Sequence, residues 1–115
     1  MIYGFNEKKE KVDFVIVTGD VTINAGTNVG VVTFVSQQLI NFGFKDGNPN
    51  NYILVGIEQK QSSSANWSQS PFVYNGQVYP RATPTPNNLS LSCYTNSTSD
   101  QDTVFNVRAV FMKVA

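Results

Sequence analysis

The side chains of this chain that could act in acid–base catalysis are carboxylic acids, because histidine is absent. The sequence has no histidine and a single cysteine, Cys93. Histidine is the commonest general base and the usual activator of serine and cysteine nucleophiles, so neither nucleophile can be paired with it here. Asp100 and Asp102 lie two residues apart, and Asp20 and Asp46 fall in predicted turns. Paired acids that hydrolyse a glycosidic bond must face each other across a cleft, and a shared polar loop does not provide that. We therefore expect a protein that is not an enzyme.

Calcium is the one cofactor for which the acidic and amide side chains offer a candidate site. Residues 46–50 (DGNPN) have the alternating oxygen ligands with which a calcium loop begins. The EF-hand pattern then requires Gly at the sixth position and Glu at the twelfth, where this chain has Asn51 and Ile57. Residues 96–102 are an equally incomplete second set. Polar β-turns explain both segments better, so we expect no metal and no other cofactor.

Aromatic side chains beside amides and hydroxyls could support binding. In or beside predicted loops rich in Asn, Gln and Ser lie Trp67, Tyr74, Tyr79 and Tyr94, and Arg81 follows closely. Aromatic faces can stack on sugar rings while neighbouring amide and hydroxyl groups bond the sugar hydroxyls, and an arginine adds a fork of donors. We take these five as candidate ligand-binding residues. The alternative is that some of the aromatics fill the core and the asparagines serve turns.

Short β-type segments, separated by Gly, Asn, Pro and Ser, must position these residues. The pattern predicts strands at residues 12–17, 20–23, 29–35, 39–44, 52–59, 89–94 and 103–114. It predicts turns or connections at residues 18–20, 24–28, 45–50, 61–69, 81–88 and 95–102. Only residues 36–39 favour a helix, of a single turn. Strands at this spacing are typical of an antiparallel β-sandwich of jelly-roll type, so the fold class we expect is all-β.

The clearest turn signal is Asn75-Gly76, which supplies the positive φ angles of a two-residue type I′ turn. It predicts a hairpin in which Val73 faces Val78. Pro71 and Pro80 bracket the hairpin, and proline cannot donate to a ladder, so we expect an edge flap.

Several predicted strands are apolar on both faces. In residues 29–35 both alternating sets are apolar, and residues 52–57 and 104–114 behave similarly. One small sandwich cannot cover both faces of so many strands, so an intersubunit contact is the natural cover. We expect a homo-oligomer; the alternative is that these strands lie in the middle of a barrel.

The distribution of charge divides the chain into two parts. Charged residues make up 14% of the chain, against roughly 25% in ordinary domains, yet six of them crowd the first thirteen residues. We expect a short attachment peptide, residues 1–13, in front of one β-sandwich domain, residues 14–115. The net charge is zero and no basic stripe is present, which argues against nucleic acid as a partner. The first ten residues lack a signal-peptide apolar segment and no run is long enough to cross a bilayer, so we expect no membrane association.

A family resemblance extends this interpretation. Residues 1–12 (MIYGFNEKKEKV) resemble the N-terminus of small structural proteins of tailed bacteriophages. The β portion is similar in style to phage fibre-head, receptor-binding and decoration domains, and more distantly to H-type lectins over residues 42–57 and 105–111. These families are typically noncatalytic homotrimers of β-sandwich or jelly-roll type. The chain departs from them in having no coiled-coil or collagen-like shaft, and no lectin site residue maps onto it.

The resemblance implies a homotrimeric virion protein, made in the host cytoplasm, that acts as a capsid decoration or short fibre-head protein. Its partners would be other virion proteins of the capsid or tail. Tyr3 and Phe5 would anchor the attachment peptide, and Lys8, Lys9 and Lys11 would set its register. The alternative function is a receptor-binding, lectin-like module that recognises host-surface carbohydrate through the aromatic residues.

Overall fold

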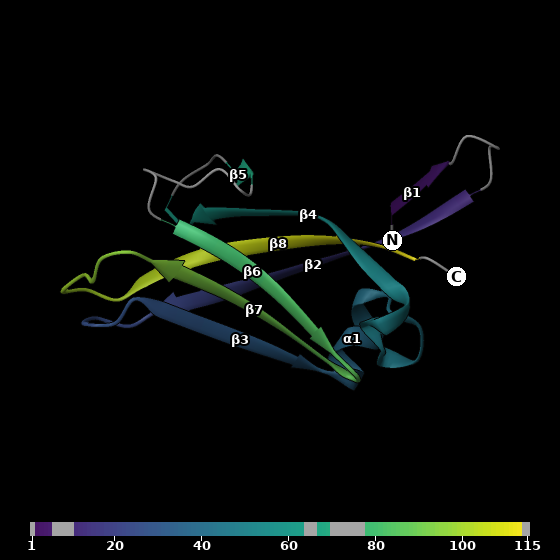
Figure 1. The fold of residues 1–115 in the computed structure, drawn as a ribbon, viewed down its shortest axis with the longest axis horizontal. Helices are drawn as coiled ribbons and strands as arrows, with labels where there is room; N and C mark the ends of the chain where they lie inside the picture. The colour runs from purple at the N-terminus through teal and green to yellow at the C-terminus, as the bar shows by residue number, and fades with distance from the viewer. Residues whose placement is uncertain (1, 6–10, 64–66, 70–77, 114–115) are drawn as a thin grey trace.

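Two antiparallel β-sheets and one short helix make up the computed structural model, which describes residues 2–5, 11–63, 67–69 and 78–113 (Figure 1). The larger sheet has, in spatial order, β1 (Ile2–Phe5), β2 (Lys11–Ile23), β8 (Thr103–Lys113), β4 (Tyr52–Gln61) and β5 (Ser68–Gln69). The smaller sheet has β3 (Val29–Val35), β7 (Asn88–Thr95) and β6 (Val78–Thr85). The expected all-β class is confirmed. No helix in the described ranges is long and apolar enough to cross a membrane.

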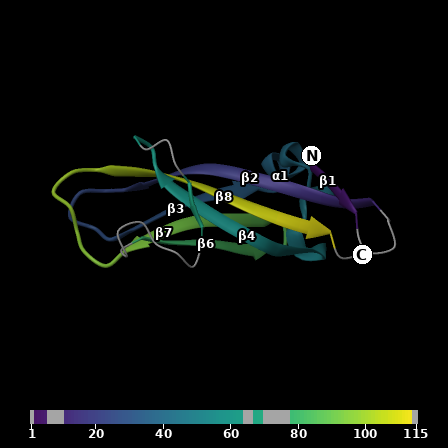
Figure 2. The same ribbon diagram turned by 90° about the horizontal axis from the view of Figure 1, so that it is seen from above.

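A two-stranded ribbon passes from one sheet to the other. β2 pairs with β8 in the larger sheet, and the strands adjoining them in sequence, β3 and β7, pair in the smaller one. The two crossing loops, residues 24–28 and 96–102, are tied together. The Gly26 N–H donates to the Ser99 carbonyl at 2.8 Å, and the Ala25 N–H donates to Asp102 Oδ1 at 2.7 Å. Figure 2 shows both loops at the end of the molecule opposite the N-terminus.

The core lies between the two sheets and is built by strand alternation. On β8 the inward residues Phe105, Val107, Ala109 and Phe111 are buried while their neighbours are half-buried. Buried residues of other strands join it, among them Val15, Val17, Val21 and Ile23 on β2, and Leu89, Leu91 and Cys93 on β7. Phe44 closes one end, with its ring edge-on to Phe111 and Tyr52 at centroid distances of 5.3 and 4.9 Å.

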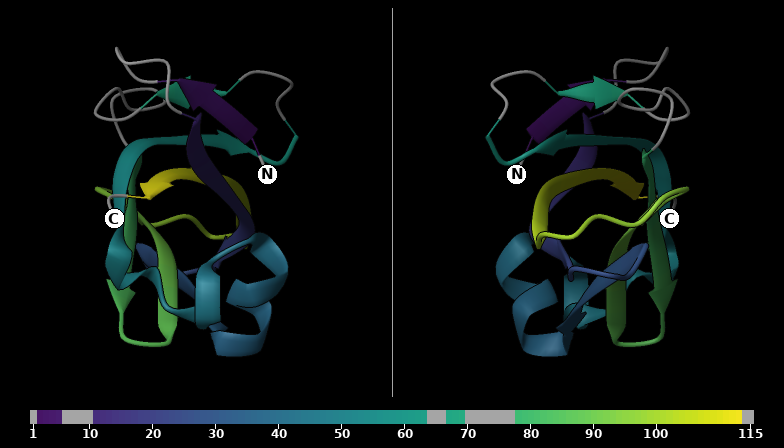
Figure 3. Two further views of the ribbon diagram at one scale, coloured as in Figure 1. Left: turned by 90° about the vertical axis from the view of Figure 1, so that its right-hand side faces the viewer. Right: turned by 90° about the vertical axis from the view of Figure 1, so that its left-hand side faces the viewer.

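The strand predicted at residues 39–44 is wrong, because residues 39–42 belong to helix α1 (Ser36–Phe42), which extends the helical turn predicted at residues 36–39. Leu39 and Phe42, three residues apart, point to the same side of a helix. Leu39 is fully buried, and Phe42 packs edge-on against Phe34 at 5.1 Å. Gly43, at φ 117°, ends the helix in a conformation that favours glycine. The end-on views of Figure 3 show α1 at the lower side of the two sheets.

The turn predicted at residues 18–20 is also wrong, because β2 runs through it without a break. Gly19 is buried and faces the core, where a Cβ would lie only 2.9 Å from Cζ of Phe34. This glycine therefore makes room for an aromatic ring rather than forming a turn. Asp20 faces outward and accepts a hydrogen bond from Asn106 Nδ2 at 2.5 Å.

The proline-rich connection predicted at residues 81–88 is mostly strand. Residues 81–85 belong to β6, an edge strand that pairs along its length with β7. Proline is tolerated in a sheet where its nitrogen faces away from the neighbouring strand, and an edge strand provides such positions for Pro80 and Pro84. Other predicted strands are confirmed, residues 29–35 with identical bounds. The predicted loop at residues 61–69 contains the two-residue strand β5.

Residues of the predicted attachment peptide form a hairpin with the start of the first long strand. β1 pairs with β2 from Ile2–Phe14 to Phe5–Lys11. In Figure 1 this pair projects from the two-sheet body. Tyr3, Phe5 and Lys11 lie on these strands, whereas Lys8, Lys9 and the predicted turn at Asn75-Gly76 lie outside the described residues.

Candidate binding surface

Strand register brings two tyrosines that are distant in sequence onto one face of the three-stranded sheet. Tyr79 on β6 lies opposite Tyr94 on β7, and Tyr94 lies opposite Val29 on β3. Paired residues point to the same side of a sheet, so the three form a row across its outer face. Their exposed fractions are 44%, 46% and 54% in that order. The two phenol rings are tilted by 42° at a centroid distance of 6.1 Å.

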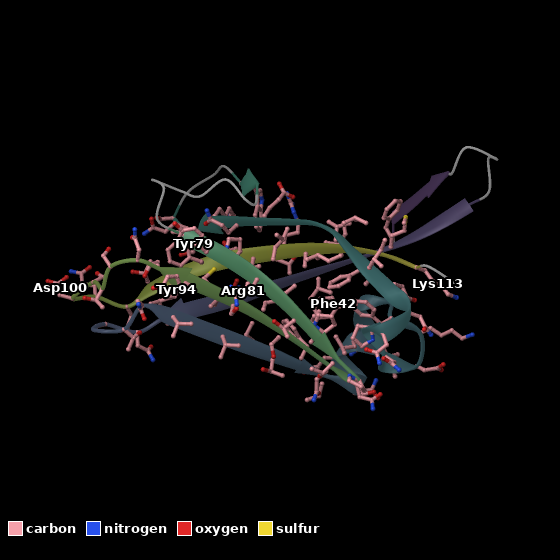
Figure 4. The ribbon with its side chains drawn as sticks, viewed as in Figure 1. Phe42, Tyr79, Arg81, Tyr94, Asp100 and Lys113 are labelled. Carbon is pink, nitrogen blue, oxygen red and sulfur yellow. The ribbon has the colours of Figure 1, made fainter. Side chains whose placement is uncertain are left out.

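The neighbouring row supplies polar groups to the same place. There Arg81, Ser92 and Val31 are paired across the three strands. A surface hollow of about 430 Å³ lies over the two rows and is lined by Val29, Tyr79, Arg81, Ser92 and Tyr94. Figure 4 shows Tyr79, Tyr94 and Arg81 close together on β6 and β7. Within the described part of the chain Arg81 forms no ion pair, so its guanidinium donors are open to a ligand or partner.

This arrangement is suited to binding. The floor is aromatic and aliphatic, and among the described residues the one charged side chain that lines the hollow is the guanidinium of Arg81, which has hydrogen-bond donors and no acceptor. Such a surface can receive a sugar ring or an apolar side chain, and it can hold a hydrogen-bond acceptor at its edge.

Comparison of the chain with protein-family models, with curated proteins and with solved structures found no match in any of the three. The chemistry of this surface therefore has to be argued from its own residues.

The five predicted ligand-binding residues do not form one site. Tyr79, Arg81 and Tyr94 come together, but Trp67 lies against the other sheet. The Arg108 guanidinium is 4.1 Å from the centroid of the Trp67 ring, and Lys60 Nζ is 5.6 Å from it. Tyr74 falls outside the described residues.

The contacts of Trp67 belong to the outer face of the five-stranded sheet. Arg108 lies between the fully buried Val107 and Ala109 on β8, so it points away from the core. Its Nε and Nη2 both donate to Glu58 Oε1 on the adjacent strand, at 3.0 and 2.9 Å. A guanidinium that holds a carboxylate and also covers an indole ring is already engaged, so this place is a packed cluster.

Two residues of the hollow, Val29 and Ser92, were not predicted from the sequence as binding residues. Val29 begins a strand whose two faces are both apolar, which was a usable signal that one face would remain exposed. Ser92 carries no signal of its own, because it joins the hollow only through its pairing with Val31 and Arg81.

Two of the four acids considered for catalysis, and one amide of the candidate calcium loop, are used in local structure. Asp20 bonds to Asn106 and Asp102 caps Ala25. Asn48 Oδ1, in the candidate calcium loop, accepts the N–H of Asn50 between the short 3-10 turns η1 (Lys45–Gly47) and η2 (Pro49–Asn51). No group of three or more His, Cys, Asp or Glu that could hold a metal ion occurs among the described residues.

The single cysteine, a potential nucleophile, is held in its unreactive thiol form. Cys93 points into the core from β7 and is fully buried. Burial disfavours the charged thiolate and raises the pKa of the Cys93 thiol to about 12, from an ordinary value of 9.0. A reactive cysteine needs the opposite shift.

Proposed function

We propose that this protein is a noncatalytic component of a homo-oligomeric assembly and that it associates through exposed apolar strand surfaces. The observation that carries the proposal is the amount of apolar side chain left open on two surfaces. On the smaller sheet the exposed residues are Val29, Val31, Val35, Tyr79 and Tyr94, and on β4 they are Ile53, Leu54 and Val55. Contiguous apolar patches of this kind mark interaction sites.

The second surface lies where the larger sheet has an open edge. β5 pairs only with Glu58 and Gln59 of β4, so the described neighbours leave the first half of β4 unpaired on that side. Ile53, Leu54 and Val55 are consecutive there, and a bulge between Leu54 and Gly56 interrupts the alternation. Both faces of the strand are therefore apolar and accessible at this point. Zero net charge and few charged residues add little electrostatic opposition to association.

The setting that we propose for this assembly is a bacteriophage virion, with the protein as a capsid decoration or short fibre-head protein and a homotrimer as its form. The resemblance of residues 1–12 to phage structural proteins supports this setting. The hairpin of β1 and the start of β2 would be the attachment arm, since it projects from the body (Figure 1).

A jelly-roll winding for the two sheets is part of the same proposal. It is supported by the way the ribbon of β2 and β8 in one sheet continues as that of β3 and β7 in the other, since a jelly roll is likewise built of strand pairs shared between two sheets. Jelly rolls form viral capsid and lectin domains. This support is an analogy of fold, and fold alone does not fix function.

Native mass in solution tests the proposal. We expect multi-angle light scattering of the full chain, at concentrations from about 1 to several hundred micromolar, to give a mass that rises to a discrete multiple of 12.7 kDa. A mass of 12.7 kDa at every concentration would contradict it.

Carbohydrate binding is the second candidate function, and the hollow over Tyr79, Tyr94 and Arg81 favours it. The test is a glycan array with three proteins: the native chain, Tyr79→Ala, and Trp67→Ala as the control on the opposite sheet. Saturable binding that is lost in Tyr79→Ala and kept in Trp67→Ala is the expected pattern. No binding by the native chain, or equal binding by all three, would exclude this site.

A further inference from the structure

We propose that β3 is a self-pairing edge, so that two copies of the chain join their three-stranded sheets into one continuous six-stranded sheet about a two-fold axis at Val31. This inference rests on the proposed homo-oligomeric assembly and names one of its surfaces. A two-fold contact joins chains in pairs, so a homotrimer would need a second surface, and the β3 edge would then join one trimer to another.

The open edge of β3 carries backbone groups that no described strand satisfies. β3 is terminal in its sheet, and in Figure 1 it forms the lower rim. Asn28 accepts a hydrogen bond from the Thr95 N–H at 2.8 Å, so Asn28 faces β7. Residues of an antiparallel strand alternate between facing the partner and facing away, which places the N–H and C=O groups of Val29, Val31 and Thr33 on the open side.

Two further contacts agree with this alternation. Val35 is an odd-numbered residue like Val29, Val31 and Thr33, so its N–H also points away from β7, and it donates to Gln38 Oε1 at 2.9 Å. The hydroxyls of Thr33 and Ser90 lie 3.0 Å apart, the close approach typical of a pair that exchanges no backbone hydrogen bonds. The open edge therefore offers the backbone groups of three residues, since Val35 is already engaged.

The opposite edge of the same sheet is protected. Successive residues of β7 bond alternately to β6 and to β3, so the backbone groups of Tyr94 and Ser92 bond to β6. The β6 residues opposite Cys93 and Leu89 form no backbone hydrogen bonds with β7. Those positions are occupied by Pro80 and Pro84. Both prolines stand where an N–H would point outward, which removes donors from this edge. β3 has neither proline nor any charged residue, the two common devices against edge pairing.

The occupant is a second copy because the edge is complementary to itself. Antiparallel pairing centred on Val31 sets Val31 against its own copy and Val29 against Thr33, so the open groups of all three residues are used in about six hydrogen bonds. The side chains brought opposite each other are uncharged, and Val31, the most exposed valine of the strand at 63%, lies on the axis. A two-fold interface requires this kind of self-complementarity.

The length of the edge limits the strength of the contact. One short strand pair buries less area than the roughly 1,200 Å² of a stable interface. We therefore expect a dimer that dissociates in the roughly micromolar range, unless further surfaces join it in a larger assembly.

Sedimentation velocity of full-length variants tests the edge. Val31→Lys would place two like charges directly opposite each other, and we expect it to raise the dissociation constant about tenfold or more. Thr85→Lys is the matched control, because it adds the same charge to an exposed position on the other edge of the same sheet. We expect Thr85→Lys to associate like the native chain. Circular dichroism checks that both variants fold.

Amide hydrogen exchange on the native chain gives a second readout that needs no substitution. On raising the concentration we expect protection to increase at Val31, Val29 and Thr33, while Val32 and Phe34, bonded to β7, are protected throughout. An oligomer that keeps its mass in Val31→Lys and gains no protection at these amides would overturn the β3 edge and leave the proposed assembly standing. A native chain that is monomeric at every concentration would overturn both.

Discussion

Cys93 illustrates how position in the sheet determines the chemistry of a single residue. It lies on the inner face of β7, opposite Pro80 and Gly30, and burial raises the pKa of its thiol to about 12. Its side chain is therefore a small apolar part of the core rather than an accessible nucleophile. In the unfolded chain the thiol returns to its ordinary pKa of 9.0.

This difference predicts a loss of stability in alkali that depends on Cys93. Between pH 9 and 12 the unfolded thiol loses its proton while the folded one retains it, so rising pH favours the unfolded state; below pH 9 the contribution is constant. At pH 10.5 we expect this to remove about 2 kcal/mol of the free energy of unfolding relative to pH 8. Guanidinium unfolding of the native chain and of Cys93→Ala at both pH values measures it. Equal changes in the two proteins would contradict the prediction.

At the scale of elements, the crossing of β2 over β3 depends on a glycine that the sequence did not single out. Gly30 is buried on the inner face of β3, where a Cβ would overlap the carbonyl oxygen of Thr22 and lie 3.0 Å from Cγ1 of Val21. Backbone on one side and a core side chain on the other leave no direction in which a methyl group can be accommodated. The two sheets can therefore approach here only at a residue without a side chain.

The matched pair Gly30→Ala and Gly56→Ala tests this close approach. Both glycines lie in strands and neither has a positive φ angle, but a Cβ at Gly56 would meet nothing within 4 Å. We expect Gly30→Ala to lower the free energy of unfolding by about 2 kcal/mol or more, and Gly56→Ala to change it by less than about 1 kcal/mol. Chemical denaturation measures both. Similar values for the two variants would show that β2 and β3 do not touch as described.

The same scale explains which elements could be predicted from the sequence. β-Branched runs such as residues 29–35 specify a strand locally, and residues 29–35 were predicted with the correct bounds. The structure of residues 39–44 was not predicted correctly, because the sequence around Leu39 and Phe42 fits either a short helix or a strand. Packing of Leu39 in the core and the left-handed conformation of Gly43 favour the helix. The sequence pattern predicts a connection at Pro84 and the end of an edge flap at Pro80, whereas a single edge strand accepts both prolines because their nitrogens face outward.

Because residues 81–88 were predicted as a connection, the sequence could not predict which of the candidate binding residues lie together. Tyr79 and Tyr94 meet only because β6 and β7 pair in a particular register, and treating residues 81–88 as a loop removed this register. The residue types were correctly singled out, yet Trp67 was grouped with them because sequence reasoning had no means of assigning it to the other sheet. Composition can predict a binding chemistry, but pairing decides which of its residues share a surface.

At the scale of the whole molecule, the equilibrium between separate and associated folded chains should affect the melting temperature. The proposed association would cover the apolar surface that this 115-residue chain leaves open on β3 and on the first half of β4. If folded copies pair, dilution shifts the equilibrium toward separate and then unfolded chains, so the melting temperature must depend on concentration.

We expect each tenfold dilution across the micromolar range to lower the melting temperature of the native chain by roughly 3 °C, because tenfold in concentration corresponds to about 1.4 kcal/mol for a pair of chains of this size. Differential scanning calorimetry from several hundred down to about one micromolar measures this. The Val31→Lys variant should melt near the dilute limit at every concentration, since it lacks the pairing that dilution removes. Thr85→Lys should follow the native chain. A native melting temperature that does not change with dilution would mean that the open valines of β3 are not covered by a second copy.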